Sequence, residues 1–164
     1  MEMLDRPSWE WGLSLIVLTM AIHAAAVVVM AWASMSIRAR LEPRNLNLLQ
    51  VVLILVCLIG VFGLLLAMLH GIESRIWAAP YLWLGALNSA LDALLFSVDS
   101  MTTRGASGLT LPAHWQMMGA LEAVDGMLLF GISTAFVFAV LQAYWSMLAE
   151  LVTRSKAERA TVPK

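Results

Sequence analysis

An arginine stands in a short polar stretch between two apolar runs of the chain. The stretch SVDSMTTRGASGLTLP covers residues 97–112 and places Arg104 after a pair of threonines and before a glycine. Arginine keeps its charge, and a charge at membrane depth is usually paired or functional. Asp99, five residues earlier, is the candidate partner. Three interpretations stay open: a structural pair with Asp99, a guanidinium that lines an electropositive pathway, and exposure at an outer mouth.

Two acids lie close together in a later apolar run. Glu122 and Asp125 are three residues apart, so they lie near each other if the segment is helical. They either brace the loop over 102–112 or a neighbouring subunit, or form an acidic ring that concentrates cations. Asp92 follows Ser89 at the spacing of a helix capping box, which predicts a helix start.

The histidines and the single cysteine do not predict a metal site or a catalytic group. His70 and His114 lack the spacing of metal ligands with other donors. His23 stands alone in its run, which favours a contact between helices over a proton relay. Cys57 lies in an apolar run, and no phosphate-binding loop or nucleophile with a suitably spaced acid or histidine occurs. We therefore expect no enzyme activity, no metal and no cofactor.

The composition indicates a membrane protein. Of the 164 residues, 61% are hydrophobic and 13% are charged, whereas about a quarter are charged in soluble domains. The net charge of −1 argues against nucleic acid as a partner. Three runs reach the roughly 20 apolar residues that cross a bilayer. They cover residues 11–37, 46–72 and 115–150.

Basic residues predict the orientation of these spans. They cluster between the first two runs and after the third: Arg38, Arg40, Arg44, Arg154, Lys156, Arg159 and Lys164. The positive-inside rule places both clusters in the cytoplasm. We therefore expect a multi-pass protein of the plasma (cytoplasmic) membrane, with its N-terminus outside and its C-terminus in the cytoplasm. Residues 151–164 would form a polar cytoplasmic tail.

The segment between the second and third runs is expected to dip into the membrane from outside. Its apolar part, residues 86–101, is too short to cross and return as helices. The capping signal predicts a helix over 89–101, after which 102–112 returns as an irregular segment. Irregular backbone at membrane depth requires surrounding protein or a water-filled path. The segment therefore predicts a pore, a cavity or a tightly packed oligomer.

This plan resembles the pore of tetrameric potassium channels. The sequence ALLFSVDSMTTRGASG is similar to the pore-helix end and filter of that family, and HWQMMGALEAVDGMLLFGISTAFVFAVL is similar to the inner helix of bacterial two-helix pores. The resemblance covers roughly residues 66–145. It implies an all-α membrane protein with three transmembrane helices, a re-entrant pore helix and a filter loop. The implied segments are an additional helix with a cytoplasmic loop (1–45) and a pore domain (46–150) with outer helix 46–72, pore helix 89–101, filter loop 102–112 and inner helix 115–150.

The implied filter departs from the family pattern. When the threonine pair is aligned, Arg104 takes the place of the filter valine, Ala106 that of the tyrosine and Ser107 that of the second glycine. Because filter carbonyls and threonine hydroxyls replace the hydration shell of potassium, these changes argue against potassium selectivity. The resemblance assigns the ion pathway to Thr102, Thr103, Arg104, Gly105, Ala106, Ser107 and Gly108, and the support of the filter to Asp99, Glu122 and Asp125. Gly126 and Gly131 are either inner-helix hinges or points of close helix packing.

The resemblance implies a homotetrameric ion channel with an altered, weakly selective cation filter. Its partners would be copies of itself, the lipid bilayer and permeant monovalent ions. Two alternatives stay open. One is an anion-permeable pore lined by Arg104, and the other is a non-conducting, channel-like membrane protein with a structural or regulatory role.

Overall fold

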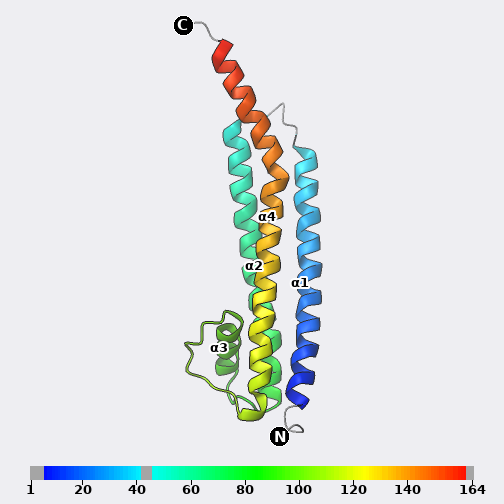
Figure 1. Ribbon diagram of the computed structural model, residues 1–164, viewed down its shortest axis with the longest axis vertical. Coiled ribbons are helices and arrows are strands. Elements are labelled where there is room, and N and C mark those ends of the chain that lie inside the picture. Colours follow the sequence, from blue (N-terminus) through cyan, green and yellow to red (C-terminus); the bar gives the residue numbers. More distant parts are fainter. Residues whose placement is uncertain (1–5, 42–45, 162–164) are drawn as a thin grey trace. The chain divides into compact units, whose positions relative to one another are not determined.

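The computed structural model describes residues 6–41 and 46–161, with side chains described for 7–41 and 46–154. These residues form helices and no strand (Figure 1): α1 (Arg6–Arg40), α2 (Leu48–Trp83), α3 (Ala90–Met101), the short 3₁₀ helix η2 (Ala113–Trp115) and α4 (Gln116–Thr161). Arg44 and Lys164, which served to predict the orientation, lie outside the described residues, as do the side chains of Lys156 and Arg159.

Three of the helices are long and apolar enough to cross a membrane: Pro7–Arg40, Leu48–Trp83 and Ala113–Arg154. Their side chains are arranged opposite to those of a soluble bundle. Val17 and Trp32 are 70% and 71% exposed, whereas the buried set includes polar and ionisable residues: Thr19, His23, Glu73, Glu122 and Asp125. A protein that is surrounded by lipid is expected to have apolar groups on its surface and its polar groups inside. The chain is therefore an all-α protein of the multi-pass membrane class, as predicted.

The second span is longer than predicted. The apolar run was expected to end at residue 72, but α2 continues to Trp83. Glu73 does not end the helix because its carboxylate is buried against another helix rather than exposed to lipid. The helix is terminated by Gly85, which lies two residues after Trp83 and has a φ of +67°. Its N–H donates to the carbonyl of Leu82 at 3.1 Å, and the next N–H, of Ala86, reaches back to Tyr81 at 2.9 Å, which is a Schellman motif.

The short helix α3 coincides with the predicted helix over 89–101. Ser89 is its N-cap, and the Ser89 side chain accepts a hydrogen bond from the N–H of Asp92 at 3.4 Å. With 12 residues, α3 is about 18 Å long and cannot cross a bilayer. No regular element occurs between Met101 and Ala113, so the predicted loop over 102–112 is present. The last helix, α4, continues to Thr161, and the predicted tail is helical up to that residue.

The chain divides into two compact units. The first unit comprises Met1–Ala26 and Leu66–Ser133, and the second comprises Val27–Leu65 and Thr134–Lys164. In the first unit, segments of α1, α2 and α4 run side by side, and α3 packs beside α2 and α4 (Figure 1). Its core includes Leu15, Trp77, Tyr81, Met118 and Leu129. The second unit has a smaller core around Val51, Met147 and Leu151. All predicted site residues belong to the first unit.

Candidate functional site

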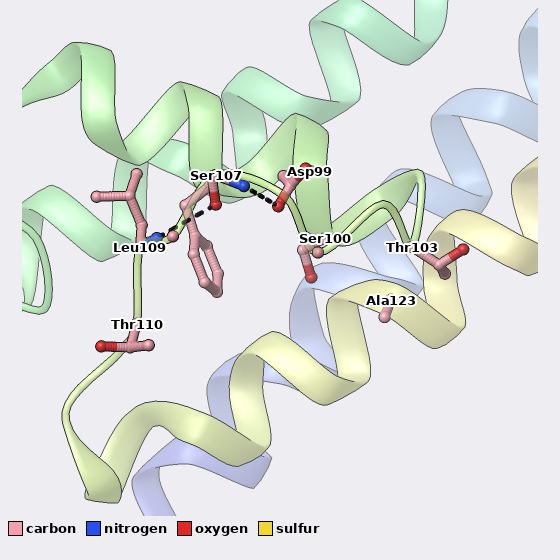
Figure 2. Close-up of a pocket in the computed structure, with 10 residues that line it drawn as sticks. Asp99, Ser100, Thr103, Ser107, Leu109, Thr110 and Ala123 are labelled. Carbon is pink, nitrogen blue, oxygen red and sulfur yellow. Dashed lines mark hydrogen bonds between the residues drawn. The ribbon is translucent and has the colours of Figure 1, made fainter.

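The loop that follows α3 is held by the carboxylate of Asp99. One oxygen accepts a hydrogen bond from Arg104 Nε at 2.5 Å. The other accepts from the main-chain N–H of Ser107 at 3.0 Å, as Figure 2 shows. The predicted contact between Asp99 and Arg104 is therefore present. The Asp99 side chain is 5% exposed and the Arg104 side chain 59% exposed. The Ser107 N–H first, and Arg104 second, stabilise the ionised carboxylate and hold the pKa of Asp99 well below its usual range.

Several main-chain N–H groups of this loop are bonded to the end of α3. The N–H of Thr103 donates to Ser100, that of Arg104 to the main-chain carbonyl of Asp99, and that of Ser107 to the Asp99 carboxylate. Among the described residues, the carbonyl oxygens of 102–107 have no hydrogen-bond partner. Most of the free main-chain groups of residues 102–107 are therefore acceptors, although the N–H of Gly105 also makes no hydrogen bond in the described structure.

The shape of the loop depends on left-handed backbone conformations. Gly105 and Gly108 have φ of +62° and +70°, which glycine adopts without strain. Thr103 has φ of +53°, which is unusual for a β-branched residue. A cavity of about 380 Å³ lies between α3, the loop and α4 (Figure 2). It is lined by Phe96, Asp99, Thr103, Ser107, Leu109 and Ala123, among others.

Glu122, on α4, joins α4 to α2 and α3. Its carboxyl accepts a hydrogen bond from the hydroxyl of Tyr81 at 2.7 Å and contacts the hydroxyl of Ser97. The same Ser97 hydroxyl lies 2.7 Å from the main-chain carbonyl of Ser74 on α2. These contacts fit the bracing interpretation of Glu122, although the segment it holds is α3 rather than the loop.

Asp125 does not contact the loop within the described residues, which differs from its predicted role as filter support. Its carboxylate accepts hydrogen bonds from Trp77 Nε1 at 2.8 Å and from the hydroxyl of Thr19 at 2.6 Å, and so ties α4 to α2 and α1. Residues three apart on a helix differ by about 60° in direction. This difference is enough to direct Glu122 toward α3 and Asp125 toward α1.

Gly126 and Gly131 have different surroundings. A Cβ atom on Gly126 would lie 2.2 Å from the main-chain oxygen of Met101, at the end of α3, and 2.7 Å from its Cα. A Cβ atom on Gly131 would meet nothing within 4 Å in the described structure. Gly126 therefore permits the close approach of α3 and α4, and Gly131 has no such role within the chain.

We expect Gly126→Ala to lower the free energy of unfolding by about 1–3 kcal/mol, because the backbone of Met101 cannot rotate away as a side chain can. The control Gly131→Ala should raise stability by up to about 1 kcal/mol, because alanine favours the helix. Thermal unfolding of the purified protein in detergent, followed by tryptophan fluorescence, checks both. Equal behaviour of the two variants would contradict the packing assigned to Gly126.

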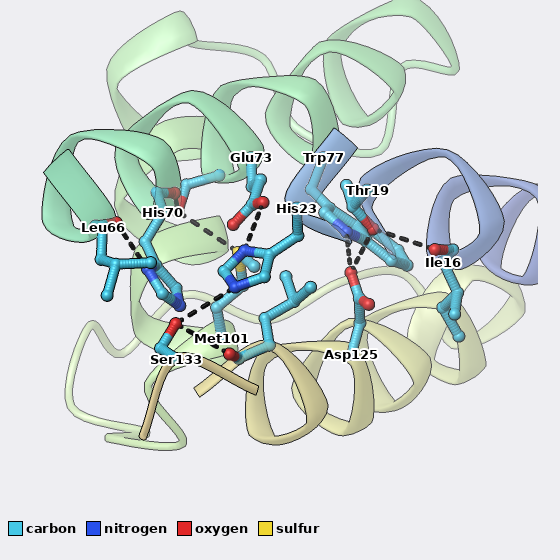
Figure 3. A network of polar contacts seen from close by, with 12 residues as sticks. Ile16, Thr19, His23, Leu66, His70, Glu73, Trp77, Met101, Asp125 and Ser133 are labelled. Carbon is cyan, nitrogen blue, oxygen red and sulfur yellow. Dashed lines mark hydrogen bonds and ion pairs between the residues drawn. The ribbon is translucent and has the colours of Figure 1, made fainter. Parts of the chain in front are cut away.

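Sequence reasoning missed a third group of polar residues. His23 Nδ1 lies 2.9 Å from Glu73 Oε1, and His70 places a ring nitrogen beside these two atoms (Figure 3). The prediction that His23 makes a contact between helices is confirmed, since Glu73 belongs to α2. The missed signal was the spacing of His70 and Glu73, which lie three residues apart and so share one face of a helix. That spacing indicates a possible site only once α1 is known to place His23 beside the same face.

Comparison with known proteins gives no match to a protein-family model, to a curated protein or to a solved structure. The resemblance to potassium-channel pores therefore rests on the motifs quoted above.

Proposed function

We propose that the chain is the subunit of a homotetrameric ion channel with a weakly selective cation pathway. In this proposal α3 is the re-entrant pore helix, residues 102–112 form the loop nearest the fourfold axis, and α4 is the inner helix. The protein lies in the plasma (cytoplasmic) membrane with its N-terminus outside and its C-terminus in the cytoplasm. The motif resemblance over residues 66–145 motivates the proposal, and the basic residues in the last turn of α1 and in α4 motivate the orientation.

The observation that carries the proposal is the polarity of the loop. The N–H groups of Thr103, Arg104 and Ser107 are bonded to the end of α3, and the carbonyl oxygens of residues 102–107 are left as acceptors. Free carbonyl oxygens at membrane depth suit the replacement of a cation's hydration shell, which is how cation filters work. Thr102 and Thr103 add hydroxyl oxygens at the start of the same loop.

The pairing of Arg104 supports a cation pathway over an anion pathway. Asp99 offsets the guanidinium charge within each subunit, so four copies would not place four uncompensated positive charges around an axis. The exposure of the Arg104 side chain, 59%, is the observation that favours the alternative of an anion-permeable pore. The two alternatives differ in the sign of the ion that passes.

The outer surface of α3 supports assembly. Leu91, Leu95 and Val98 are 64%, 44% and 40% exposed and recur at the spacing of one helical face. One chain supplies only one short helix and one loop, whose free carbonyls need water, ions or further protein at membrane depth. A ring of four subunits would cover the apolar face and enclose the loops around a shared path.

Ion flux in liposomes tests the proposal. Protein reconstituted into vesicles is expected to pass potassium and sodium with permeabilities within about tenfold of each other, and to exclude chloride. Reversal potentials in asymmetric salt give the ratios, and native mass spectrometry or chemical cross-linking is expected to give four chains. A current carried mainly by chloride would contradict the cation pathway and support the anion-permeable pore. Absence of flux from a correctly assembled tetramer would replace it with a non-conducting role.

A further inference from the structure

Three ionisable side chains meet in the interior of the first unit, away from the loop. His23 comes from α1, and His70 and Glu73 come from α2. His23 and Glu73 are fully buried, and Figure 3 shows all three side chains pointing toward one another. One nitrogen of each histidine and one oxygen of Glu73 lie within 4.8 Å of one another. Ionisable groups are rare inside membrane proteins and mark functional sites.

The ring of His70 is oriented with one lone pair toward this group. His70 Nδ1 lies 2.7 Å from the main-chain carbonyl of Leu66, which only accepts hydrogen bonds, so Nδ1 carries the proton. The ring also stacks on Phe130, with centroids 4.3 Å apart and planes at 21°. In the neutral ring, His70 Nε2 is therefore an acceptor. It is buried and has no hydrogen-bond partner among the described residues.

Ser133, on α4, contacts the second ring nitrogen of His23. The Ser133 hydroxyl lies 3.0 Å from the carbonyl of Leu129 and 3.1 Å from His23 Nε2, and its single proton serves one of these two acceptors. When the hydroxyl donates to Leu129, it accepts from His23 Nε2–H, and Nδ1 of the neutral ring presents a lone pair to Glu73 Oε1 at 2.9 Å. Two acceptors at this distance repel unless a positive ion lies between or beside them.

A single added proton would not pair all the acceptors of this group. Protonation of His23 would turn its contact with Glu73 into an ion pair, but two further acceptors would remain. They are His70 Nε2 and Glu73 Oε2, both buried and both without a hydrogen-bond partner in the described part of the chain. Unpaired buried acceptors are costly, and more so in a membrane interior. An ion that accepts several lone pairs at once removes the whole cost.

We propose that His23 Nδ1, His70 Nε2 and the carboxylate of Glu73 bind a divalent first-row transition metal ion, with Zn²⁺ as the best match. Two imidazoles and one carboxylate are a donor set that zinc accepts, and imidazole suits such metals better than Mg²⁺ or Ca²⁺. Around a tetrahedral ion with bonds of about 2.1 Å, donor atoms lie about 3.4 Å apart. The three ligand atoms now lie within 4.8 Å of one another. Side-chain rotations that move each atom by about 1 Å would bring them to the spacing of a tetrahedral site.

The surroundings of the group match those of known metal sites. Histidines that bind metals usually donate their other N–H to a carbonyl or another acceptor, which fixes the ring. Here the Leu66 carbonyl holds His70, and the Ser133 hydroxyl holds His23. Three protein donors leave a fourth position for water or a further ligand. The bound ion would link α1 to α2, independently of whether the loop over 102–112 conducts ions.

Metal analysis of the full-length protein tests this proposal. The protein is purified in detergent with a tag that contains no histidine, stripped with a chelator and incubated with Zn²⁺. We expect about one zinc ion per chain after removal of unbound metal. His70→Ala and Glu73→Gln should lower the affinity at least about tenfold, and Ser133→Ala by about 10–100-fold. His114→Ala, which removes the exposed histidine of η2, should leave binding unchanged.

A second measurement covers variants that fold poorly. Zinc should raise the thermal unfolding temperature of the natural chain and of His114→Ala, because the ion binds only the folded state. Co²⁺ in place of zinc should give the visible absorption of a four-coordinate nitrogen and oxygen site in the natural chain. Binding that persists in His70→Ala, or that His114→Ala abolishes, overturns the proposal. So does a natural chain that binds no Zn²⁺, Co²⁺, Mn²⁺ or Ni²⁺, and the His23–Glu73 contact would then be a protonated ion pair.

Discussion

Replacing Glu122 with alanine is expected to lower the free energy of unfolding by about 2–4 kcal/mol, whereas replacing it with glutamine should cost less than about 1 kcal/mol. Glu122 is fully buried where α2, α3 and α4 meet. Alanine would leave the hydroxyl of Tyr81 without its acceptor and the hydroxyl of Ser97 without one of its two hydrogen-bond partners, and it would open a cavity. Glutamine keeps the volume and a carbonyl oxygen for Tyr81.

The tolerance of glutamine follows from a count of protons around Ser97. The Ser97 hydroxyl has one proton, yet it lies at hydrogen-bond distance from two acceptors, the carbonyl of Ser74 and the carboxyl of Glu122. Both contacts are hydrogen bonds only if the carboxyl of Glu122 itself carries a proton and donates it. A neutral carboxyl is also the form expected in an apolar interior, and among the described residues no basic group pairs with Glu122. The amide of glutamine reproduces that donor.

Thermal unfolding in detergent, followed by the fluorescence of the seven tryptophans, measures these effects. Glu150→Ala is the matched control, because it removes an exposed acid from the same helix, and it should change stability by no more than about 0.5 kcal/mol. If Glu122→Gln proved as destabilising as Glu122→Ala, the carboxyl would be ionised and the proton count would be wrong. If both were harmless, Glu122 would not brace α3.

The parts of this fold that depend on neighbouring residues could be predicted from the sequence. The spans follow from apolar length, and α3 was placed at 89–101 because Ser89 and Asp92 form a local capping signal. The pair of Asp99 and Arg104 could also be predicted, because Asp99 lies at the end of a helix and Arg104 follows five residues later in the loop, within reach of its carboxylate. The resemblance to channel pores pointed to the same segment.

The parts that depend on distant residues could not be predicted. The second span was expected to end at residue 72, but α2 continues to Trp83, because Glu73 is buried against α1 rather than exposed to lipid. Asp125 was assigned to the loop, but its partners Thr19 and Trp77 come from helices whose rotation no local pattern gives. For the same reason His23, His70 and Glu73 could not be recognised as one group. Their meeting requires the packing of α1 on α2.

Replacing Asp99 with alanine is expected to release the loop after α3 and to make it sensitive to trypsin. In the natural chain the Asp99 carboxylate holds the loop at Arg104 and again at Ser107. A protease needs several residues of extended, mobile backbone around the bond that it cuts, so cleavage after Arg104 requires local opening. We expect this cleavage to be at least about tenfold faster in Asp99→Ala than in the natural chain. Flux through the reconstituted protein should fall in parallel if the loop forms the pathway.

Asp92→Ala is the control for this experiment, because it removes an acid from the first turn of the same helix, at the end remote from the loop. Its cleavage after Arg104 should match that of the natural chain. Asp99→Asn should be intermediate, because an amide oxygen still accepts from Ser107 but does not attract the guanidinium. Equal cleavage in all variants would show that the carboxylate does not hold the loop, and the left-handed residues Thr103, Gly105 and Gly108 would then suffice to shape it.

The same contacts predict how the loop responds to pH. Because hydrogen bonds from Ser107 and Arg104 favour the ionised carboxylate, the pKa of Asp99 is lower in the folded chain than in the unfolded chain. The stabilisation is therefore fully present above the unfolded value of about 4 and is lost only as the pH falls below it toward the folded value. Hydrogen exchange of the Ser107 amide, corrected for its intrinsic rate, should show constant protection from pH 7 to about pH 5. Protection that is lost already near pH 6 would assign the hold on the loop to a group other than Asp99.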